Sequence, residues 1–372
     1  MTMRATIAIR SLAAALTAAV VLLAVGLSAV MLPASAQTFD RQAMVAGWLT
    51  ETILPLHQDF AAEAADLEDA ALAFAADPAE QTLEAFQSAW IDAVMAFERI
   101  SVFSLQRVMP LLTQIGGTAV SIENIEDQIA LREPGSIDAD FVGALGSSSK
   151  GLPALEYLLF AGSLEGLQAD RNRIDYAVAA AVDIRKVADA LVVEWTPGTD
   201  GYYGDKFMSD TLEITSVRSM VSMVTNELFS AIQAIGSEHL GGPLGLSSGG
   251  EIQPELVESP YSGTSVRRMA ANIETVRRMF EGSDDMPGMA DYLDFIGARL
   301  EDRPLSDVVM ARIAAVETAL SAITEPLSEA LVHDPAAVKA AYEEVMALLQ
   351  LAKSDVANQL GITITFGDSD GD

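Results

Sequence analysis

Apolar residues along this 372-residue chain recur mainly at spacings of three and four, which is the period of an amphipathic helix. The clearest stripe consists of Leu83, Phe86, Trp90, Val94 and Phe97. We expect these side chains to share one helical face and to lie in the core. The preceding run Asp77-Pro78-Ala79-Glu80 predicts the start of this helix, with Asp77 as the cap and Pro78 in the first position.

The helical period continues over most of the chain. Further helices are expected at residues 172–194, 213–235, 266–281, 289–299, 305–320 and 335–360. Pro55 is predicted to kink the first helix, which opens near Met44. Residues 362–366 alternate like a short strand, with an extended tail over the helices as the alternative, and no other strand pattern is apparent. The predicted fold class is therefore all-α.

Composition divides the chain into segments. Residues 237–262 are rich in Gly, Ser and Pro and are predicted to form a linker. It separates an N-terminal helical bundle, residues 37–236, from a C-terminal bundle, residues 263–372. A chain of this length is longer than a single hydrophobic core usually supports, and this favours two packed helical bundles.

Residues 1–36 have the pattern of a secretory signal peptide. Arg4 and Arg10 supply positive charge, an apolar run follows, and Ala34-Ser35-Ala36 offers a cleavage site. Residues 11–32 are long enough to span a membrane, so an uncleaved anchor is the alternative. We expect cleavage, a periplasmic location and no stable membrane anchor afterwards.

The formal net charge of −31 arises from 22 Lys and Arg against 53 Asp and Glu. Such an acidic chain repels phosphate backbones, so nucleic acid is excluded as a partner. The chain has no cysteine, which excludes disulfides and a lipid-modified cysteine anchor.

Residues 151–160 read Gly-Leu-Pro-Ala-Leu-Glu-Tyr-Leu-Leu-Phe. This run resembles the Gly-x-His-x-x-Glu signature of the imelysin family, with Pro153 in place of the histidine. Three more pieces follow the family order, and they are Trp90-x6-Phe97-Glu98-Arg99, Glu258-Ser259-Pro260-Tyr261-Ser262-Gly263 and the segment 360–372. The resemblance covers most of the mature chain and is strongest to imelysin-like periplasmic proteins. It implies two helical bundles with a site between them, a link to bacterial iron uptake, and relatives classed as metallopeptidases.

In the family pattern the histidine and glutamate share one helical face and can bind one metal ion. Pro153 has no donor atom, but it suits the first position of a helix. Glu156 then lies one turn inside among apolar residues and needs a partner. The resemblance implies six ligand-binding candidates, namely Glu156, Glu98, Arg99, Glu258, Ser259 and Ser262.

Three of these, Glu156, Glu98 and Glu258, are also the candidate metal ligands. They offer the oxygen ligands that iron or another hard cation prefers. They meet only if the two bundles face each other as in the family. The alternative is a structural salt bridge between Glu156 and Arg99 or Arg107.

Catalytic residues are not expected. His57, His239 and His333 have no zinc-binding spacing, and we expect all three at the surface. The serines at 147–149 lack a placed histidine or lysine partner, although Lys150 follows them. The aromatic residues Trp195, Tyr202 and Tyr203 line a ligand cleft or pin their loop to the core. The terminal run Asp368-Ser-Asp370-Gly-Asp372 resembles the start of a calcium loop without its closing glutamate.

The sequence therefore predicts a periplasmic, imelysin-like binding or accessory protein that is linked to iron uptake and is non-catalytic. The cofactor is unknown, with iron or another divalent cation as the candidate, and a small ligand or an envelope protein is the candidate partner. The alternatives are a metal-dependent peptidase of the imelysin type and an envelope protein-interaction module.

Overall fold

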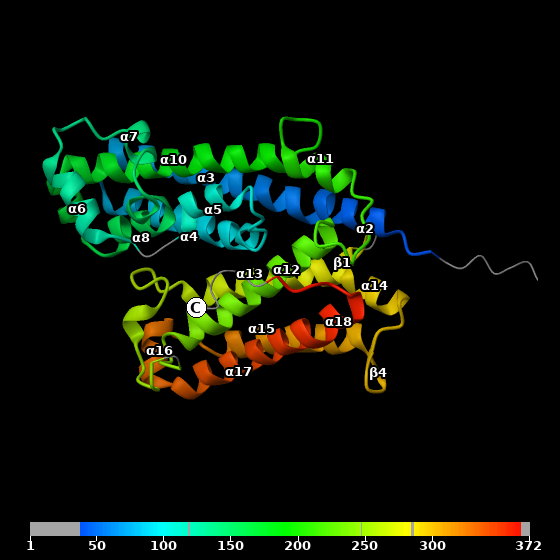
Figure 1. The fold of residues 1–372 in the computed structure, drawn as a ribbon. Helices are drawn as coiled ribbons and strands as arrows, with labels where there is room; N and C mark the ends of the chain where they lie inside the picture. Colours follow the sequence, from blue (N-terminus) through cyan, green and yellow to red (C-terminus); the bar gives the residue numbers. More distant parts are fainter. Residues whose placement is uncertain (1–37, 118–119, 247, 284–285, 366–372) are drawn as a thin grey trace, which may run out of the picture. The chain divides into compact units, whose positions relative to one another are not determined.

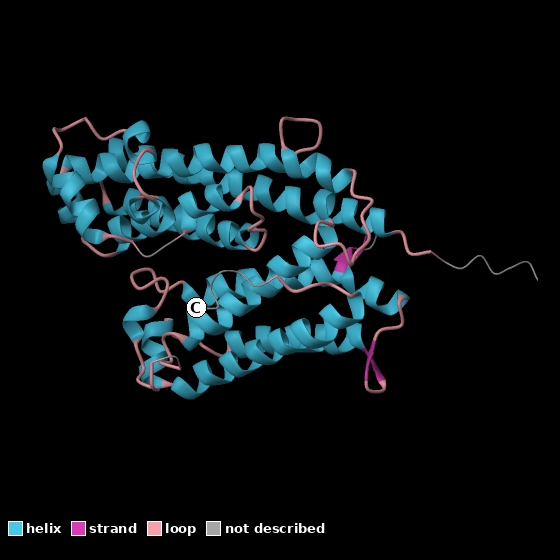
Figure 2. Cartoon of the chain, in the orientation of Figure 1, coloured by secondary structure: helices cyan, strands magenta, loops and turns pink. Residues whose placement is uncertain are grey.

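The computed structural model describes residues 38–117, 120–246, 248–283 and 286–365, and residues 41–372 form one compact unit. Helices make up nearly all of its regular structure, which confirms the all-α prediction (Figure 2). The predicted signal peptide, residues 1–36, and the acidic run at 368–372 lie outside the described residues.

The first bundle is built on three long helices. They are α3 (Leu54–Ala76), α4 (Glu80–Ser101) and α10 (Arg171–Trp195), and α3 packs against both others (Figure 1). Shorter elements surround them: α5 (Met109–Gly116), α6 (Ile122–Leu131), α7 (Ala139–Gly143), η2 (Ser147–Ser149), α8 (Gly151–Phe160), α9 (Leu164–Ala169) and α11 (Tyr202–Met208). Helix α8, which carries the Gly151–Phe160 motif, contacts α4 and α10.

The second bundle is built on α13 (Ser265–Glu281), α15 (Leu305–Ser321) and α17 (Pro335–Leu351), with α15 against both others. Its shorter elements are α12 (Met220–Ala234), η3 (Ile235–Gly241), η4 (Pro254–Leu256), α14 (Met289–Phe295), α16 (Leu327–His333), η5 (Ala352–Val356) and α18 (Ala357–Leu360). Helix α13 packs against α4 of the first bundle, so the predicted pair of packed bundles is confirmed.

The predicted residue boundary between the bundles stays a prediction. Helix α12 precedes the expected boundary at residue 236, but it packs against α17 and α13. The π-helical η3 continues α12 as far as Gly241, so the expected linker begins as helix. Helix α12, which lies on the amino-terminal side of the predicted linker, therefore packs with the second bundle.

The amphipathic stripe on α4 forms core as predicted, because all five of its apolar residues are buried. The helix nevertheless begins at Glu80 with Ala79 as its cap, so the predicted start at Asp77 and Pro78 is wrong. The cause is Thr82, whose hydroxyl accepts a hydrogen bond from the Ala79 amide and donates one to the carbonyl of Asp77.

Helix α2 (Arg41–Gly47) leads through the π-helix η1 (Trp48–Ile53) into α3, where Pro55 is the second residue. A proline removes one helical N–H and crowds the carbonyl four residues earlier, and a π-turn just before it accommodates both effects. The predicted distortion at Pro55 therefore takes the form of a π-turn.

Several boundaries differ from the prediction. Helix α12 begins only at Met220, and α14 ends at Phe295. Two very short hairpins, which the sequence did not predict, pair β1 (Gly282–Ser283) with β2 (Met286–Pro287) and β3 (Arg299–Leu300) with β4 (Arg303–Pro304). Each spans only two residues per strand, too few for a period of two to show in the sequence.

The carboxyl-terminal residues follow the alternative of an extended tail. Asn226 on α12 donates to the Thr363 carbonyl and accepts from the Thr365 amide. Among the described residues, no helix has the length and apolar character needed to cross a membrane.

Candidate functional site

Arg268 on α13 is the centre of the candidate site. Its side chain is only 4% exposed, because residue 268 lies on the same face of α13 as the core residues Met269, Ile273 and Val276. An arginine on a core face must be paired, since a buried charge without partners is very costly. Its partners come from both bundles.

The first partner is Glu98 on α4. Glu98 Oε1 lies 2.6 Å from Arg268 Nη2 and 2.8 Å from Nε. Asn272, one turn further along α13, donates to Glu98 Oε2 at 2.9 Å and to its backbone carbonyl at 2.7 Å. Both carboxylate oxygens of Glu98 are therefore occupied by α13, and this contact joins the two bundles.

The second partner is Glu258, in the segment that precedes α13. Its Oε1 lies 2.8 Å from Arg268 Nη2, and its Oε2 lies 3.2 Å from Nδ1 of His239. His239 belongs to the π-helix η3, and π-helices are frequent at functional sites. Arg268 Nη1 also donates to Ser259 Oγ at 2.8 Å. The guanidinium group of Arg268 thus contacts two carboxyl groups and one hydroxyl.

Glu156 is bound by a different kind of partner. Its Oε1 accepts hydrogen bonds from the Ser262 amide at 2.9 Å, the Ser262 hydroxyl at 2.8 Å and the Tyr261 amide at 3.3 Å. All three donors are neutral. Burial raises the pKa of Glu156 above its ordinary value, although the bonds from Ser262 and the charge of Arg268 oppose that shift.

The cluster of Arg268 with Glu98, Glu258 and Glu156, here called the Arg268 cluster, contains more acid than base. Burial favours the neutral guanidine, but the charges of Glu98 and Glu258 outweigh it and raise the pKa of Arg268. Arg268 therefore stays protonated at every relevant pH. One guanidinium lies among three carboxyl groups, so the site has a surplus of carboxyl groups.

The structure thus brings together five of the six predicted ligand-binding residues, through Arg268 and the 258–262 segment. Their binding roles stay predictions. The sixth, Arg99, points elsewhere and pairs with Glu274 at 3.1 Å. Arg107 pairs with Glu194, so the predicted alternative of a salt bridge from Glu156 to Arg99 or Arg107 is wrong. Neutral donors beside Arg268 take that role.

Pro153 is the third residue of α8, and not the first as predicted. The first four amides of a helix have no partner within it, so proline fits there as well. Helix α8 begins two residues earlier than predicted, at Gly151, whose φ is +75°. A Cβ at this position would lie 2.2 Å from the carbonyl oxygen of Ile115, so only glycine fits.

Lys150, directly before the motif, is also buried and has partners of its own. Its Nζ lies 2.7 Å from the Gly143 carbonyl, 3.1 Å from Gln114 Oε1 and 3.4 Å from Asp183 Oδ2. It is therefore occupied by a structural ion pair and offers no base to the serines at 147–149.

The three histidines occupy three different environments. His333 is exposed, as predicted. His57 is fully buried, which contradicts the prediction: its Nδ1 lies 2.7 Å from the Ile53 carbonyl, and burial lowers its pKa to about 4. His239 is half-buried against Glu258. A helical stripe that includes a histidine does not reveal whether its ring faces core or water, and this explains the error at His57.

The Trp195 loop follows one of its two predicted alternatives. Trp195 and Tyr203 are fully buried and stacked, with ring centroids 5.1 Å apart. Tyr202 is exposed and lies under the guanidinium of Arg107. These contacts pin the loop to the core.

The donor set of the Arg268 cluster does not fit a metal ion. The motif imidazole is absent at position 153, Glu98 is held by Arg268 and Asn272, and Glu156 by the 261–262 backbone. A cation would have to displace these donors beside a permanent positive charge.

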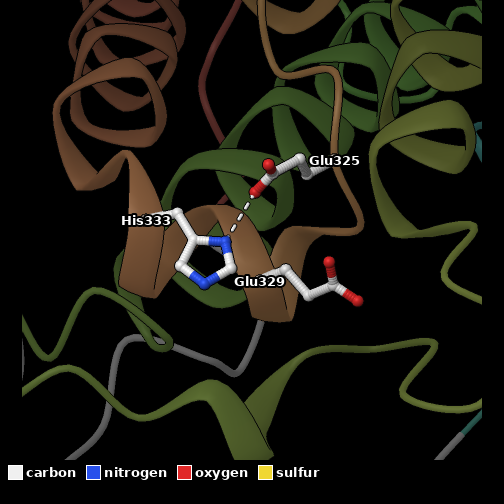
Figure 3. Close-up of side chains that lie close together, drawn as sticks. All are labelled: Glu325, Glu329 and His333. Atoms are coloured by element: carbon white, nitrogen blue, oxygen red, sulfur yellow. Dashed lines mark hydrogen bonds and ion pairs between the residues drawn. The ribbon is translucent and has the colours of Figure 1, made fainter.

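One group among the described residues does have ligand atoms within 4.8 Å of one another, and it comprises Glu325, Glu329 and His333. Figure 3 shows His333 Nδ1 bonded to Glu325, at 2.9 Å, with Glu329 beside them. All three side chains are exposed, and exposed acidic groups are ordinarily solvated by water. The cluster belongs to α16 and the loop before it, and none of its members was a predicted ligand.

Sequence reasoning missed Arg268, Asn272 and His239. A signal for the first two was present, because Arg268 and Asn272 are four residues apart and in register with the apolar stripe of α13. Polar residues on a core face indicate a buried network. His239 had no such signal, since a π-turn changes the facing of every residue in it.

The model of the imelysin family matches residues 53–354, so the chain belongs to that family. It is 24% identical over 292 residues to iron-regulated protein A of Synechococcus elongatus, covering 76% of each chain.

Two solved structures have the same fold. An imelysin-like protein from Psychrobacter arcticum has a TM-score of 0.70 at 17% identity, covering 87% of this chain and 96% of its own. A putative iron-regulated protein A precursor from Parabacteroides distasonis has a TM-score of 0.72 at 17% identity, covering 88% and 97%.

Proposed function

We propose that this chain is an exported, non-catalytic member of the imelysin family that acts as a binding or accessory component of iron uptake in the cell envelope. The link to iron draws on the family and on relatives named iron-regulated protein A. The export draws on the signal pattern of residues 1–36, and a structural relative is named as a precursor.

One observation carries the non-catalytic part of the proposal. Arg268 occupies the position between Glu98 and Glu258, where its Nη2 contacts both carboxyl groups at 2.6 and 2.8 Å. A metallopeptidase needs about three protein ligands with an open coordination position and a general base. A guanidinium in that place supplies fixed positive charge and hydrogen bonds, but it can neither bind water as a metal does nor take up a proton.

The same geometry supports binding. The Arg268 cluster lies where α4, α13 and the 258–262 segment meet, so anything that changes its hydrogen bonds also acts on the contact between the bundles. Its surplus of carboxyl groups disfavours an anionic ligand. The bound species proposed here is therefore a small neutral ligand or an envelope protein partner, and not an anion.

The test of the iron role uses the producing bacterium. Deletion of the gene should lower uptake of radioactive iron in iron-poor medium, and the wild-type gene should restore it. Arg268→Lys keeps the charge but loses the fork, and it should restore uptake poorly; Arg185→Lys, on an exposed pair with Asp189, is the matched control. Both variants must be present in the envelope at wild-type level. Unchanged iron uptake after deletion would contradict the proposal.

The test of catalysis uses the purified protein. It should not hydrolyse peptides with added zinc, because the motif imidazole is missing. Chelator-sensitive cleavage that disappears in Glu156→Ala would establish the peptidase alternative. Periplasmic location is tested by fractionation, with a mature amino terminus expected at Gln37.

A further inference from the structure

A pocket of about 330 Å³ opens at the carboxyl end of α8. Its apolar lining includes Leu158 and Leu167, both buried. Its polar lining includes Asp170 and Arg173, at the start of α10, and Tyr157. Its volume lies at the lower end of the range typical of small-molecule sites, and polar and apolar groups contribute about equally to its lining.

Glu126 holds Arg173 in place but occupies only part of its hydrogen-bonding capacity. Its Nη2 lies 2.5 Å from Glu126 Oε2, and the Tyr157 hydroxyl donates to the other oxygen of Glu126 at 2.6 Å. A guanidinium has five N–H groups in a planar fork. Glu126 therefore fixes the orientation of Arg173, and further donors remain for a ligand carboxylate.

Asp170 supplies the opposite charge in the same pocket. Its Oδ1 accepts from the Asn172 amide at 3.0 Å, as the cap of α10. A carboxylate has about four acceptor positions, so Asp170 can also accept from a ligand. The Asp170 carboxylate therefore favours an ammonium group.

We propose that this pocket binds a free α-amino acid with a short apolar side chain. The carboxylate pairs with Arg173, the ammonium group with Asp170, and the side chain lies against Leu158 and Leu167. Asp170 is the cap of α10 and Arg173 is its third residue, so one helix end brings a carboxylate and a guanidinium to the same pocket. A simple anion is disfavoured by Asp170 and Glu126, and a simple cation by Arg173.

The experiment is calorimetry on the purified protein with glycine, valine, leucine and phenylalanine. Isocaproate, which lacks the ammonium group of leucine, and isopentylamine, which lacks its carboxylate, are the analogues. We expect at least one apolar amino acid to bind, and each analogue of leucine to bind at least about tenfold more weakly, the effect of losing one charge-assisted hydrogen bond.

Variants locate the binding. Gly162 lines the pocket and has no atom within 4 Å of an added Cβ, so Gly162→Leu should fill the pocket without a clash. Gly146 has the same open surroundings and does not line the pocket, and Gly146→Leu is the matched control. Asp170→Asn should weaken amino-acid binding by about tenfold, but it should not weaken the binding of isocaproate, because it removes a negative charge that repels this anion.

Three results would overturn the proposal. One is that no amino acid of the panel binds at millimolar concentration. Another is that isocaproate binds as well as leucine, which would mark a plain anion site. The third is that Gly162→Leu, folded as judged by circular dichroism, binds leucine as well as Gly146→Leu does.

Discussion

Two buried cations in this molecule are handled in different ways. Lys150 and Arg268 have side chains 3% and 4% exposed. Lys150 faces one carboxylate, Asp183, and its other acceptors are neutral. Arg268 faces Glu98 and Glu258 directly and acts on Glu156.

The difference shows which buried charge is structural and which belongs to a site. The Lys150 pair is balanced and lies within the first bundle, so its partners leave no charge for a ligand to meet. The Arg268 cluster has surplus acid and joins helices from both bundles. Burying that surplus costs stability, and proteins keep such costs mainly where function requires them.

The largest expected effect is that of Arg268→Met. The substitution leaves the buried carboxyl group of Glu98 without a cation and also removes that of Glu258. We expect a loss of about 5 kcal/mol in the free energy of unfolding, the upper end for breaking one buried pair. Urea denaturation measures it, with Arg185→Met as the exposed control. A loss similar to the control would mean that water already solvates the cluster.

Lys150→Met should cost somewhat less, about 3–4 kcal/mol, because only Asp183 is stranded. The double variant Lys150→Met, Asp183→Asn leaves no buried charge and should recover at least half of that loss. No single second substitution should rescue Arg268→Met in this way, because it neutralises only one of the two carboxyl groups that have lost their cation. Equal rescue in both regions would remove the distinction between a balanced pair and a surplus.

Glu156→Gln should have a smaller effect, within about 1 kcal/mol at neutral pH, because the amide oxygen accepts the same hydrogen bonds. Glu156→Ala should cost about 1–3 kcal/mol, since it leaves the Ser262 and Tyr261 donors unsatisfied. This is less than the stranding of a cation would cost, because the partners of Glu156 are neutral.

The pH dependence sharpens this prediction. The pKa of Glu156 is raised on folding, so the folded protein binds its proton more tightly than the unfolded chain does. Its contribution is therefore most favourable below the unfolded pKa of about 4.5 and declines as pH rises toward the folded pKa. Urea denaturation across mildly acidic pH should show this decline in the wild type and not in Glu156→Gln. The same decline in both would assign it to another group.

The sequence predicted the fold better than the site. Periodicity identified the α4 stripe and most long helices, because amphipathic patterns report burial directly. Predicted helix boundaries were wrong where a single side chain determines the boundary, as Thr82 does at the start of α4. The acidic members of the site were predicted from the motif, but Arg268 was not, because its role depends on which residues of α4 face α13. The spacing on α13 indicates that Arg268 is buried, but it does not say which residues of α4 the guanidinium meets.

Pro153→His restores the missing imidazole, and its expected effect is the smallest. The new ring would lie three residues before Glu156, on the same helical face, and the first turn of α8 does not require proline. Glu156 already accepts three hydrogen bonds, and Arg268 repels a cation nearby. We therefore expect the affinity for zinc or iron(II) to rise by less than about tenfold, which corresponds to a gain of less than about 1.4 kcal/mol in binding free energy.

Calorimetry at neutral pH compares the metal affinity of Pro153→His with that of the parent protein and of Pro153→Ala. Submicromolar zinc binding by the histidine variant alone would show that Arg268 does not control the site, and the proposed contrast between the two buried cations would then fail.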